Sequence, residues 1–515
     1  MTRDLGRLGA DHADVLIVGG GIHGLFAAYD AASRGLRVVL IERDDFGAGL
    51  SFNHQRTIHG GLRALQHGAF GKVREQLAER RMWTRLAPHL IRPLPFVIGT
   101  YGLGTRSRLA LRVGLSAYDA IGSDRNVGVP EGLKLPASGV LSRVETEAAF
   151  PGIDTRGLTG GARWYDYQAR HPDRLNGLIA QAASHAGAAL FNYVECLAPM
   201  RTGERITGAR VRIWPSGEER EIEAATTVLC AGAGLPDLHQ RFGLTGSVPL
   251  IRAMNLILDR PALPAAIAAP GRSGRMLTCV PWQGYSLVGT FQSDAIVEAP
   301  EDRPPTDVVT TMLDDVRTAF PHLDADRASI RVVHHGLTPA RVTRGRADLL
   351  PESQLVTHVS QGIYSLVGVK FTTARLAAAT AIDAVCAALH RSSTSHTSNV
   401  TLPAGTAEGT AAAIDARCRG ARLALDAETR RHLVDWYGTE APDVIDHAVA
   451  TNLAFPLTPG SSVLAGEIAY ALEHGAAVRL ADAVLRRTNL GATGHPGHAS
   501  LEAAANIMAT RCHWS

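Results

Sequence analysis

The 515-residue sequence is poor in cysteine, in aromatic residues and in net charge. Its six cysteines lie far apart, with no Cys-x-x-Cys pair and no histidine at metal-ligand spacing, which argues against a disulfide framework and against a metal site. We expect reduced thiols in the core of a cytoplasmic protein. A formal net charge of +3, without a long basic run, makes nucleic acid a poor candidate partner and leaves a small-molecule substrate open.

A long apolar run is also missing from the sequence. The N-terminal segment carries charges up to its first apolar stretch, Val15 to Val18, which is too short for a signal-peptide core or a membrane span. The composition, 45% hydrophobic and 20% charged, is that of a globular chain long enough for more than one domain.

Residues 14–42 have the pattern of a strand, a glycine turn, a helix and a second strand. Gly19, Gly21 and Gly24 form G-x-G-x-x-G directly after the first strand. Such glycines allow a tight turn, the close approach of a pyrophosphate and close packing of helix on strand. Glu42 ends the second strand, where an acid that binds ribose is expected. The pattern predicts a dinucleotide site and does not by itself separate FAD from NAD.

Two later features favour FAD. The loop after Glu42 is long and bears Gly, Ser and Asn, as do loops that cover a bound flavin. Far along the chain, residues 368–375 (GVKFTTAR) form another strand-to-helix turn, which would close the other side of the same cofactor. A further apolar strand from Thr226 runs into glycines, so we expect the cofactor sheet to be assembled from distant segments.

The C-terminal part reads as a separate helical region. Residues 391–399 are polar and free of apolar anchors, which is typical of a linker. Beyond it, Asp426 is placed to cap a helix that Gly438 ends, and helical spacing continues from Gly466.

Ile58 to Leu65, IHGGLRAL, resembles the FAD-dependent glycerol-3-phosphate dehydrogenase family, within the D-amino-acid-oxidase-like flavoproteins. The likeness continues at residues 281–290, 365–375 and 467–491, the last with the late Asp followed by Arg-Arg-Thr that marks this family. It covers nearly the whole chain. It implies an α/β and α+β fold, with a Rossmann-type FAD domain, a mixed-sheet substrate domain over the flavin and a C-terminal helical domain.

The resemblance also implies domain boundaries and cofactor contacts. We expect an FAD domain of residues 1–95, 170–245 and 335–390, a substrate domain of 96–169 and 246–334, a linker of 391–399 and a helical domain of 400–515. The implied FAD contacts are Gly19, Gly21, Gly24, Glu42 and Arg43 at the adenosine half, Val194 at the adenine, His59 and Gly60 near the isoalloxazine, and Gly368, Lys370 and Phe371 at the pyrimidine edge. Arg43 and Phe371 are equally compatible with structural roles.

The catalytic residues follow from what flavin chemistry requires. Lys370 is suited to stabilise the negative charge that develops near N1 of the reduced flavin. Alcohol oxidation also needs a base, usually a histidine, yet the catalytic position that carries histidine in the family carries Asn255 here, and asparagine cannot act as a base. His59, His334 and His335 remain alternative candidates.

The implied substrate pocket departs from the family pattern. Arg63 is kept, but Ala64 replaces a tyrosine, and Thr338 and His358 stand where the resemblance implies arginines that bind phosphate. Three arginines follow shortly afterwards and either compensate as substrate ligands or form a solvated turn: Arg341, Arg344 and Arg346.

We therefore expect an FAD-dependent oxidoreductase that transfers hydride from a hydroxyl-bearing carbon to flavin N5, on a substrate other than plain glycerol 3-phosphate. Oxidation at an amine carbon and flavin binding without turnover are the alternatives. Quinone and oxygen are both candidate electron acceptors. Arginines alternate with apolar residues over 106–115, a pattern compatible with an ordinary surface helix and with peripheral contact at the inner face of the membrane.

Overall fold

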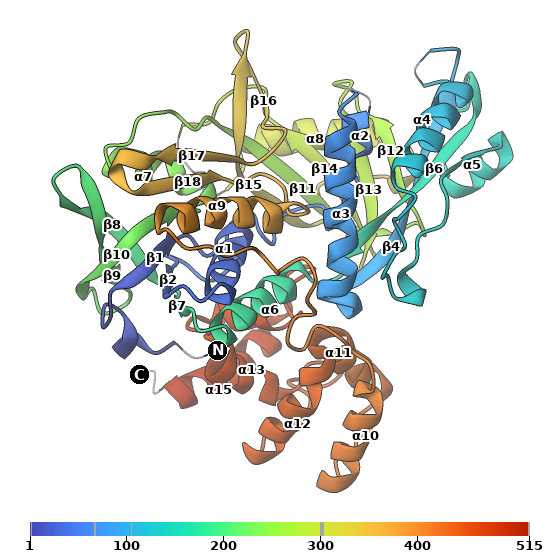
Figure 1. The fold of residues 1–515 in the computed structure, drawn as a ribbon. Coiled ribbons are helices and arrows are strands. Elements are labelled where there is room, and N and C mark those ends of the chain that lie inside the picture. Colours follow the sequence, from blue (N-terminus) through green and yellow to red (C-terminus); the bar gives the residue numbers. More distant parts are fainter. Residues whose placement is uncertain (2, 66–67, 105, 299–302, 513–515) are drawn as a thin grey trace.

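The computed structural model describes residues 1, 3–65, 68–104, 106–298 and 303–512. Its architecture consists of two large sheets and a group of C-terminal helices (Figure 1). This confirms the expected combination of α/β and α+β layers.

The first sheet has the order β17-β18-β10-β1-β2-β7, and β9 joins β8 to β10 at one side. Strand β1 lies between β2 and β10 and is parallel to both, and β18 is parallel to β10. Segments more than 200 residues apart therefore form the core of this sheet, as the sequence predicts. The strands are β1 Ala13–Val18, β2 Val38–Ile41, β7 Ala189–Phe191, β8 Val194–Thr202, β9 Arg205–Ile213, β10 Glu219–Leu229, β17 Gln354–His358 and β18 Ile363–Val367.

Helices cover this sheet on the face that carries Val15 and Ile17. The helix that follows the glycine turn, α1 (Ile22–Ser33), is almost entirely buried and packs between α6 (Pro172–His185) and α9 (Ala374–Ala388). It ends before Gly35, whose φ of 77° suits glycine. A short helix, α7 (Leu235–Arg241), packs with the other face.

The second sheet has the order β16-β15-β11-β14-β13-β12-β4-β6-β3, with β5 beside β6. Side chains alternate along its strands. Met254, Leu256 and Leu258 of β11 pack with α8 (Thr306–Ala319), so Asn255 and Ile257 lie on the opposite face. The strands are β3 Thr57–Ile58, β4 Ile91–Tyr101, β5 Gly139–Leu141, β6 Leu158–Ala169, β11 Leu250–Pro261, β12 Ala266–Pro270, β13 Met276–Trp282, β14 Tyr285–Gln292, β15 Ile330–Thr343 and β16 Arg346–Leu349.

Four helices lie near β6 of the second sheet: α4 (Arg108–Ile121) and α5 (Arg143–Ala149) pack with β6, and α2 (Leu62–Leu65) and α3 (Phe70–Leu86) pack with α4. The predicted division into domains stays a prediction. Residues 91–95 belong to β4, and residues 335–349 to β15 and β16, so both segments are strands of the second sheet.

The C-terminal helices lie below the first sheet in Figure 1. Residues 391–399 contain no helix or strand, and the Asp426 side chain caps α11 by accepting the Thr429 N–H, both as expected. Gly438, just past α11, has a φ of 54°. The helices are α10 Thr410–Ala421, α11 Ala427–Tyr437, α12 Ala441–Ala450, α13 Ala465–Gly475, α14 Leu480–Asp482, the π-helix η8 Ala483–Arg487 and α15 His498–Cys512.

Among the described residues, we find no helix long and apolar enough to cross a membrane.

Candidate active site

The glycine turn between β1 and α1 is crowded at the first and the third of its three glycines. Gly19 has a φ of 113°, and a Cβ there would lie 2.6 Å from the Cys230 carbonyl oxygen. A Cβ on Gly24 would lie 1.8 Å from the Gly19 carbonyl oxygen. These two positions therefore need glycine for the fold of the turn itself. Gly21 differs, because its added Cβ would meet only Ser51 Oγ, at 3.0 Å.

Four of the predicted adenosine contacts lie around one pocket beside this turn. They are Gly19, Glu42, Arg43 and Val194. The Glu42 carboxylate accepts the Gly20 N–H at 2.6 Å and the Asp44 N–H at 2.8 Å. Burial raises the pKa of Glu42, and these two bonds only partly oppose that rise.

The loop between β2 and β3, the cofactor loop, covers the glycine turn between β1 and α1. The Gly47 N–H donates to the Gly20 carbonyl at 2.9 Å, and Ser51 Oγ accepts the Ile22 N–H at 2.8 Å. Ser51 thus sits at the N-terminus of α1, where unpaired N–H groups favour an anion such as a pyrophosphate. The sequence places Ser51 in a cofactor loop but does not single it out.

His59 and Gly60 lie at a buried carboxylate, Asp166. The Gly60 N–H donates to Asp166 Oδ1 at 2.8 Å, and Arg80 donates to the same oxygen at 2.7 Å. His59 Nδ1 lies 3.3 Å from Asp166 Oδ2, while its side chain is 56% exposed. Burial opposes ionisation of Asp166, but His59 and Arg80 outweigh burial and keep its pKa below the ordinary value. Sequence reasoning missed Asp166, which is more than 100 positions from His59.

The turn after β18 contacts the segment that carries His59 and Gly60. The His59 N–H donates to Thr372 Oγ1 at 3.1 Å, so the two segments are in direct contact. The Phe371 ring stacks on His54, with ring centres 4.6 Å apart, and on Trp83 at 5.1 Å. These contacts give Phe371 a packing role whether or not it touches a ligand.

Gly368 is needed for the close approach of His23. A Cβ on Gly368 would lie 2.4 Å from the His23 ring. His23, the second residue between Gly21 and Gly24, therefore connects the two glycine turns, and burial lowers its pKa to about 4. His23 is neutral at physiological pH.

Lys370 and Arg63 are close enough for the charge of Arg63 to act on Lys370. Burial lowers the pKa of Lys370, Arg63 lowers it further and Glu352 opposes both. Glu352 also forms an ion pair with Lys72 at 3.0 Å. Sequence reasoning missed Glu352, since no local pattern indicates that it faces Lys370.

Asn255 is held by its neighbours on the inner face of the second sheet, which is the face opposite α8. Its Oδ1 accepts the Thr290 hydroxyl at 3.0 Å, and its strand partner in β15 is His334. His334 is buried, and burial together with Arg56 and His54 keeps its pKa well below the ordinary value. A neutral imidazole therefore lies opposite Asn255.

His335 and His334 point to opposite faces of β15 because side chains alternate along a strand. The strand partner of His335 is Met254, which packs with α8. Thr338 has the same parity as His334, so it lies on the inner face, where it is buried. On that same face, a Cβ added to Gly336 would touch Leu50 of the cofactor loop.

Two predicted substrate ligands lie away from this region. Arg341 is exposed, and its strand partner is Asp348 in the hairpin of β15 and β16, which projects from the molecule (Figure 1). His358 pairs with Ile363 at the far end of β17 and β18 from Gly368, and its ring lies 5.9 Å from His239.

The residues fit a dinucleotide with a flavin ring. Between the cofactor loop and the inner face of the second sheet, four buried polar atoms have no hydrogen-bond partner among the described residues: Asn53 Oδ1, His54 Nε2, Arg56 Nε and His334 Nδ1. Other unpaired buried atoms are scattered over the described residues, but these four lie on segments that contact one another, where a bound group could pair with them. Together with the adenosine pocket, they provide for both ends of FAD.

Comparison with known families decides the assignment. The model of a family described as FAD dependent oxidoreductase matches residues 14–384. The chain belongs to this family. This FAD-dependent oxidoreductase also matches the family described as the C-terminal domain of alpha-glycerophosphate oxidase, over residues 395–515. FAD as cofactor and enzymatic activity are thereby confirmed.

Similar proteins support the family within which the sequence resemblance places this FAD-dependent oxidoreductase. A glycerol-3-phosphate dehydrogenase of Mycobacterium leprae is 31% identical over 99% of this chain and 86% of its own. One of Synechocystis is 28% identical over 98% of this chain and 93% of its own.

The fold is also that of a solved relative. The glycerol-3-phosphate dehydrogenase of Bacillus halodurans, solved with FAD, aligns with a TM-score of 0.77 at 22% identity, over 99% of this chain and 93% of its own.

Proposed function

We propose that this enzyme oxidises a hydroxyl-bearing substrate other than plain glycerol 3-phosphate. The observation that carries the proposal is the ion pair of Glu352 with Lys72, at 3.0 Å, which brings an acid close enough to Lys370 to raise the pKa of that lysine. Recognition of a phosphate dianion ordinarily uses uncompensated cations and arginine forks. Here Glu352 offsets the cations of the pocket, and the arginines of the β15–β16 hairpin project into solvent instead.

FAD, when bound, accepts a hydride at N5. In the proposed reaction the substrate C–H bond supplies that hydride, while the hydroxyl proton passes to a protein base and a carbonyl forms. His334 is the base that the inner face supports best, because it is the strand partner of Asn255 and its Nδ1 has no hydrogen-bond partner among the described residues. His59 is the alternative, through its contact with Asp166. Asn255 then serves to orient rather than to accept a proton.

An amine is the second candidate substrate. A protonated amine would be attracted by Glu352. Once the amine is neutral, its oxidation requires no base, so the presence of Asn255 in place of a histidine would not prevent the reaction. The acceptor for the reduced flavin is proposed to be quinone or oxygen.

One experiment separates these readings. Steady-state oxidation with an artificial dye acceptor is measured for glycerol 3-phosphate, larger polyols, sugar derivatives and amines, alongside anaerobic bleaching of the flavin band. We expect glycerol 3-phosphate to be a poor substrate and an uncharged polyol or an amine to be a better one. Efficient turnover of glycerol 3-phosphate at micromolar KM would refute the proposal, and a flavin that no compound bleaches would favour binding without turnover.

A charge variant sharpens the test. Glu352→Gln removes the repulsion between this carboxylate and the substrate phosphate, and it also releases Lys72 from its ion pair. We therefore expect the KM for glycerol 3-phosphate to fall by about tenfold, equivalent to about 1.4 kcal/mol. The control Glu147→Gln removes an exposed acid that pairs with Arg143 and should leave KM unchanged. Equal behaviour of the two variants would remove Glu352 from substrate selection.

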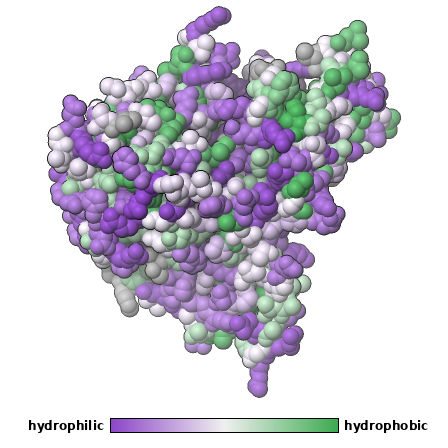
Figure 2. Space-filling model, viewed as in Figure 1, coloured by the Kyte–Doolittle hydropathy of each residue, from purple (hydrophilic) through white to green (hydrophobic). Residues whose placement is uncertain are grey.

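We also propose peripheral contact with a membrane surface through α4. Leu109 and Val113 are 71% and 63% exposed on this helix. Figure 2 shows apolar residues gathered at the upper right, where Figure 1 places α4. The exposed Arg108 and Arg112 flank them, a combination suited to an anionic lipid interface.

A further inference from the structure

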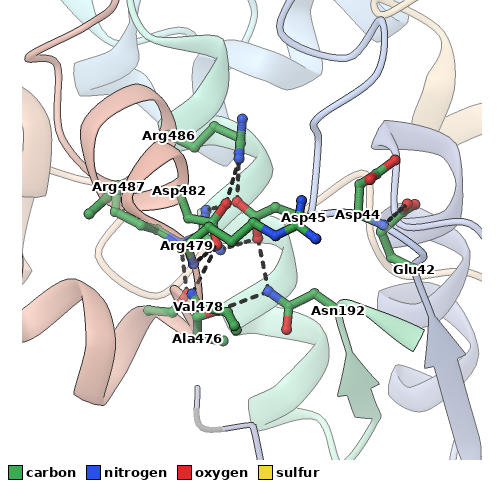
Figure 3. Close-up of polar contacts among 12 residues, drawn as sticks. Glu42, Asp44, Asp45, Asn192, Ala476, Val478, Arg479, Asp482, Arg486 and Arg487 are labelled. Atoms are coloured by element: carbon green, nitrogen blue, oxygen red, sulfur yellow. Dashed lines mark hydrogen bonds and ion pairs between the residues drawn. The ribbon is translucent and has the colours of Figure 1, made fainter. Parts of the chain in front are cut away.

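The C-terminal helices contact the cofactor loop at a buried carboxylate, Asp45 (Figure 3). The Asp45 side chain is fully buried. Arg486 Nε donates to Oδ2 at 2.6 Å, and the two terminal nitrogens of Arg487 donate to Oδ2 and Oδ1 at 2.8 and 2.7 Å. Burial opposes ionisation of Asp45, but the two arginines outweigh it and hold its pKa below the ordinary value. One loop carboxylate thus binds both arginines of the C-terminal Arg-Arg-Thr.

The same C-terminal segment contacts the strand that borders the adenosine pocket. Arg486 is also bonded to Asp482, at 2.6 Å, and Asp482 Oδ1 accepts the Tyr193 hydroxyl at 2.7 Å. The Arg479 guanidinium lies over the Tyr193 ring, 4.6 Å from its centre. Tyr193 directly precedes Val194, which lines the pocket.

Asn192 completes the cluster between these segments. Its Nδ2 donates to Asp45 Oδ1 at 3.0 Å and to the Ala476 carbonyl at 2.8 Å (Figure 3). The cluster therefore ties together the loop after β2, the start of β8 and the C-terminal helices. The first two are the segments on either side of the adenosine pocket.

The position of Asp45 is transmitted to the glycine turn within a few residues. A Cβ on Gly20 would lie 2.8 Å from Phe46 Cδ1, so the Phe46 ring lies directly against the turn. The Gly47 N–H donates to the Gly20 carbonyl, and Ser51 holds the N-terminus of α1. If the loop were released at Asp45, the contacts of Phe46, Gly47 and Ser51 with the glycine turn and α1 would lose their support.

We propose that Asp482, Arg486 and Arg487 are positioning residues for FAD, which act through Asp45 and Tyr193 to hold the walls of the adenosine pocket. On this view the C-terminal region contributes to cofactor affinity without touching the cofactor. The proposal requires only that FAD binds beside the glycine turn and is independent of the substrate.

A second contact between the same parts of the molecule provides the matched comparison. Arg174 of α6 forms an ion pair with Glu440, which also accepts the Tyr470 hydroxyl at 2.7 Å and the Gln181 side-chain amide at 3.2 Å. This contact joins the C-terminal helices to α6, and neither Arg174 nor Glu440 lines the adenosine pocket. If the C-terminal helices contributed only general stability, loss of either contact would weaken FAD binding to the same extent.

The test uses full-length Arg487→Gln, Arg487→Lys, Asp45→Asn and Glu440→Gln proteins. FAD affinity of each apoprotein is measured by quenching of flavin fluorescence, and the release rate of bound FAD is measured after dilution. We expect Arg487→Gln and Asp45→Asn to bind FAD at least about tenfold more weakly. Arg487→Lys should lie between them and the native protein, because lysine keeps the charge but not the two-pronged geometry. Glu440→Gln should stay within about twofold of native.

Two further readouts separate positioning from general loss of structure. ADP, a probe of the adenosine half alone, should show the same ranking of affinities, and saturating FAD should restore the native visible spectrum of Arg487→Gln. The proposal is overturned if the Arg487 variants bind FAD as tightly as native protein, or if Glu440→Gln is impaired to the same extent. Should Asp45→Asn fail to fold, the two Arg487 variants still decide between these outcomes.

Discussion

Gly21 differs from the other glycines of the cofactor turn in what a side chain there would obstruct. Its φ of −74° and ψ of 179° suit any residue, and only Ser51 lies near an added Cβ. We therefore expect Gly21→Val to fold but to be purified without FAD, because the branched side chain enters the pyrophosphate path. The measurement is the ratio of flavin to protein absorbance, with flavin released by heat to confirm that it is bound non-covalently.

The matched control for this substitution is Gly114→Val in α4, where an added Cβ meets nothing within 4 Å. It should retain FAD. Full FAD content in Gly21→Val would show that the pyrophosphate does not pass this residue.

Lys370 combines partial burial with neighbours of both signs, so its charge is only partly offset. We expect Lys370→Ala to retain FAD and to slow flavin reduction by about tenfold or more, because a positive charge near the developing negative charge is lost. Lys370→Arg should recover part of the rate. The measurement is anaerobic stopped-flow reduction at saturating concentration of the best substrate found, and an unchanged rate would exclude Lys370 from the reaction.

At the scale of single elements, strand parity decides which histidine can serve the active site. His334 and His335 are adjacent in sequence, yet one faces Asn255 and the other lies on the α8 side, as their partners in β11 show. The hairpin that follows carries Arg346, which pairs with Asp294 and is 65% exposed, so this element does not return its arginines to the pocket. These placements narrow the proposed base to His334 and His59.

The helix α4 is the element proposed to meet a membrane. We expect the double variant Leu109→Ser, Val113→Ser to lose most of its binding to vesicles that contain anionic phospholipid, because each buried apolar side chain contributes about 1.5 to 3 kcal/mol. The measurement is cosedimentation with phosphatidylglycerol and phosphatidylcholine vesicles. Val449→Ser, which changes an exposed apolar residue of α12, should bind as native. Native protein that fails to sediment with either vesicle would contradict the proposal.

At the scale of the whole molecule, Asp173 links stability to pH. It is buried at the start of α6, its Oδ1 has no partner among the described residues, and burial raises its pKa to about 6 despite Arg56 and Arg486. Because the folded-state pKa exceeds the unfolded value, the folded protein binds this proton more tightly. The associated stability is full below about pH 4 and is lost as pH rises through about 6.

Asp173→Asn removes this titration. We expect the variant to gain stability relative to native protein by about 2 to 3 kcal/mol between pH 4 and pH 8, most of it below pH 7. The measurement is the thermal unfolding midpoint of both proteins across this range, with the exposed Asp154→Asn as control. Parallel pH profiles for native protein and Asp173→Asn would show that Asp173 does not carry this dependence.

The sequence by itself determined that the cofactor is a dinucleotide, and it determined the strand–turn–helix unit that binds this cofactor and the helical C-terminal region. These features depend on local constraints: glycine where Gly19 and Gly24 leave no room for a Cβ, an acid at the end of β2, and Asp426 at a helix start. A local pattern is enough to read such constraints, because the atoms that impose them lie within a few residues or in the neighbouring strand.

The tertiary structure alone decided which side chains meet across long separations. Asp45 and Arg487 are 442 positions apart, and Glu352 reaches Lys370 and Lys72 only because β17 and α3 are brought to the same turn. The same holds for the placement of His358 and Arg341 away from the pocket, which follows from strand register and hairpin direction. Contacts of this kind depend on how sheets and helices pack, and the residues involved carry no local signal of their partners.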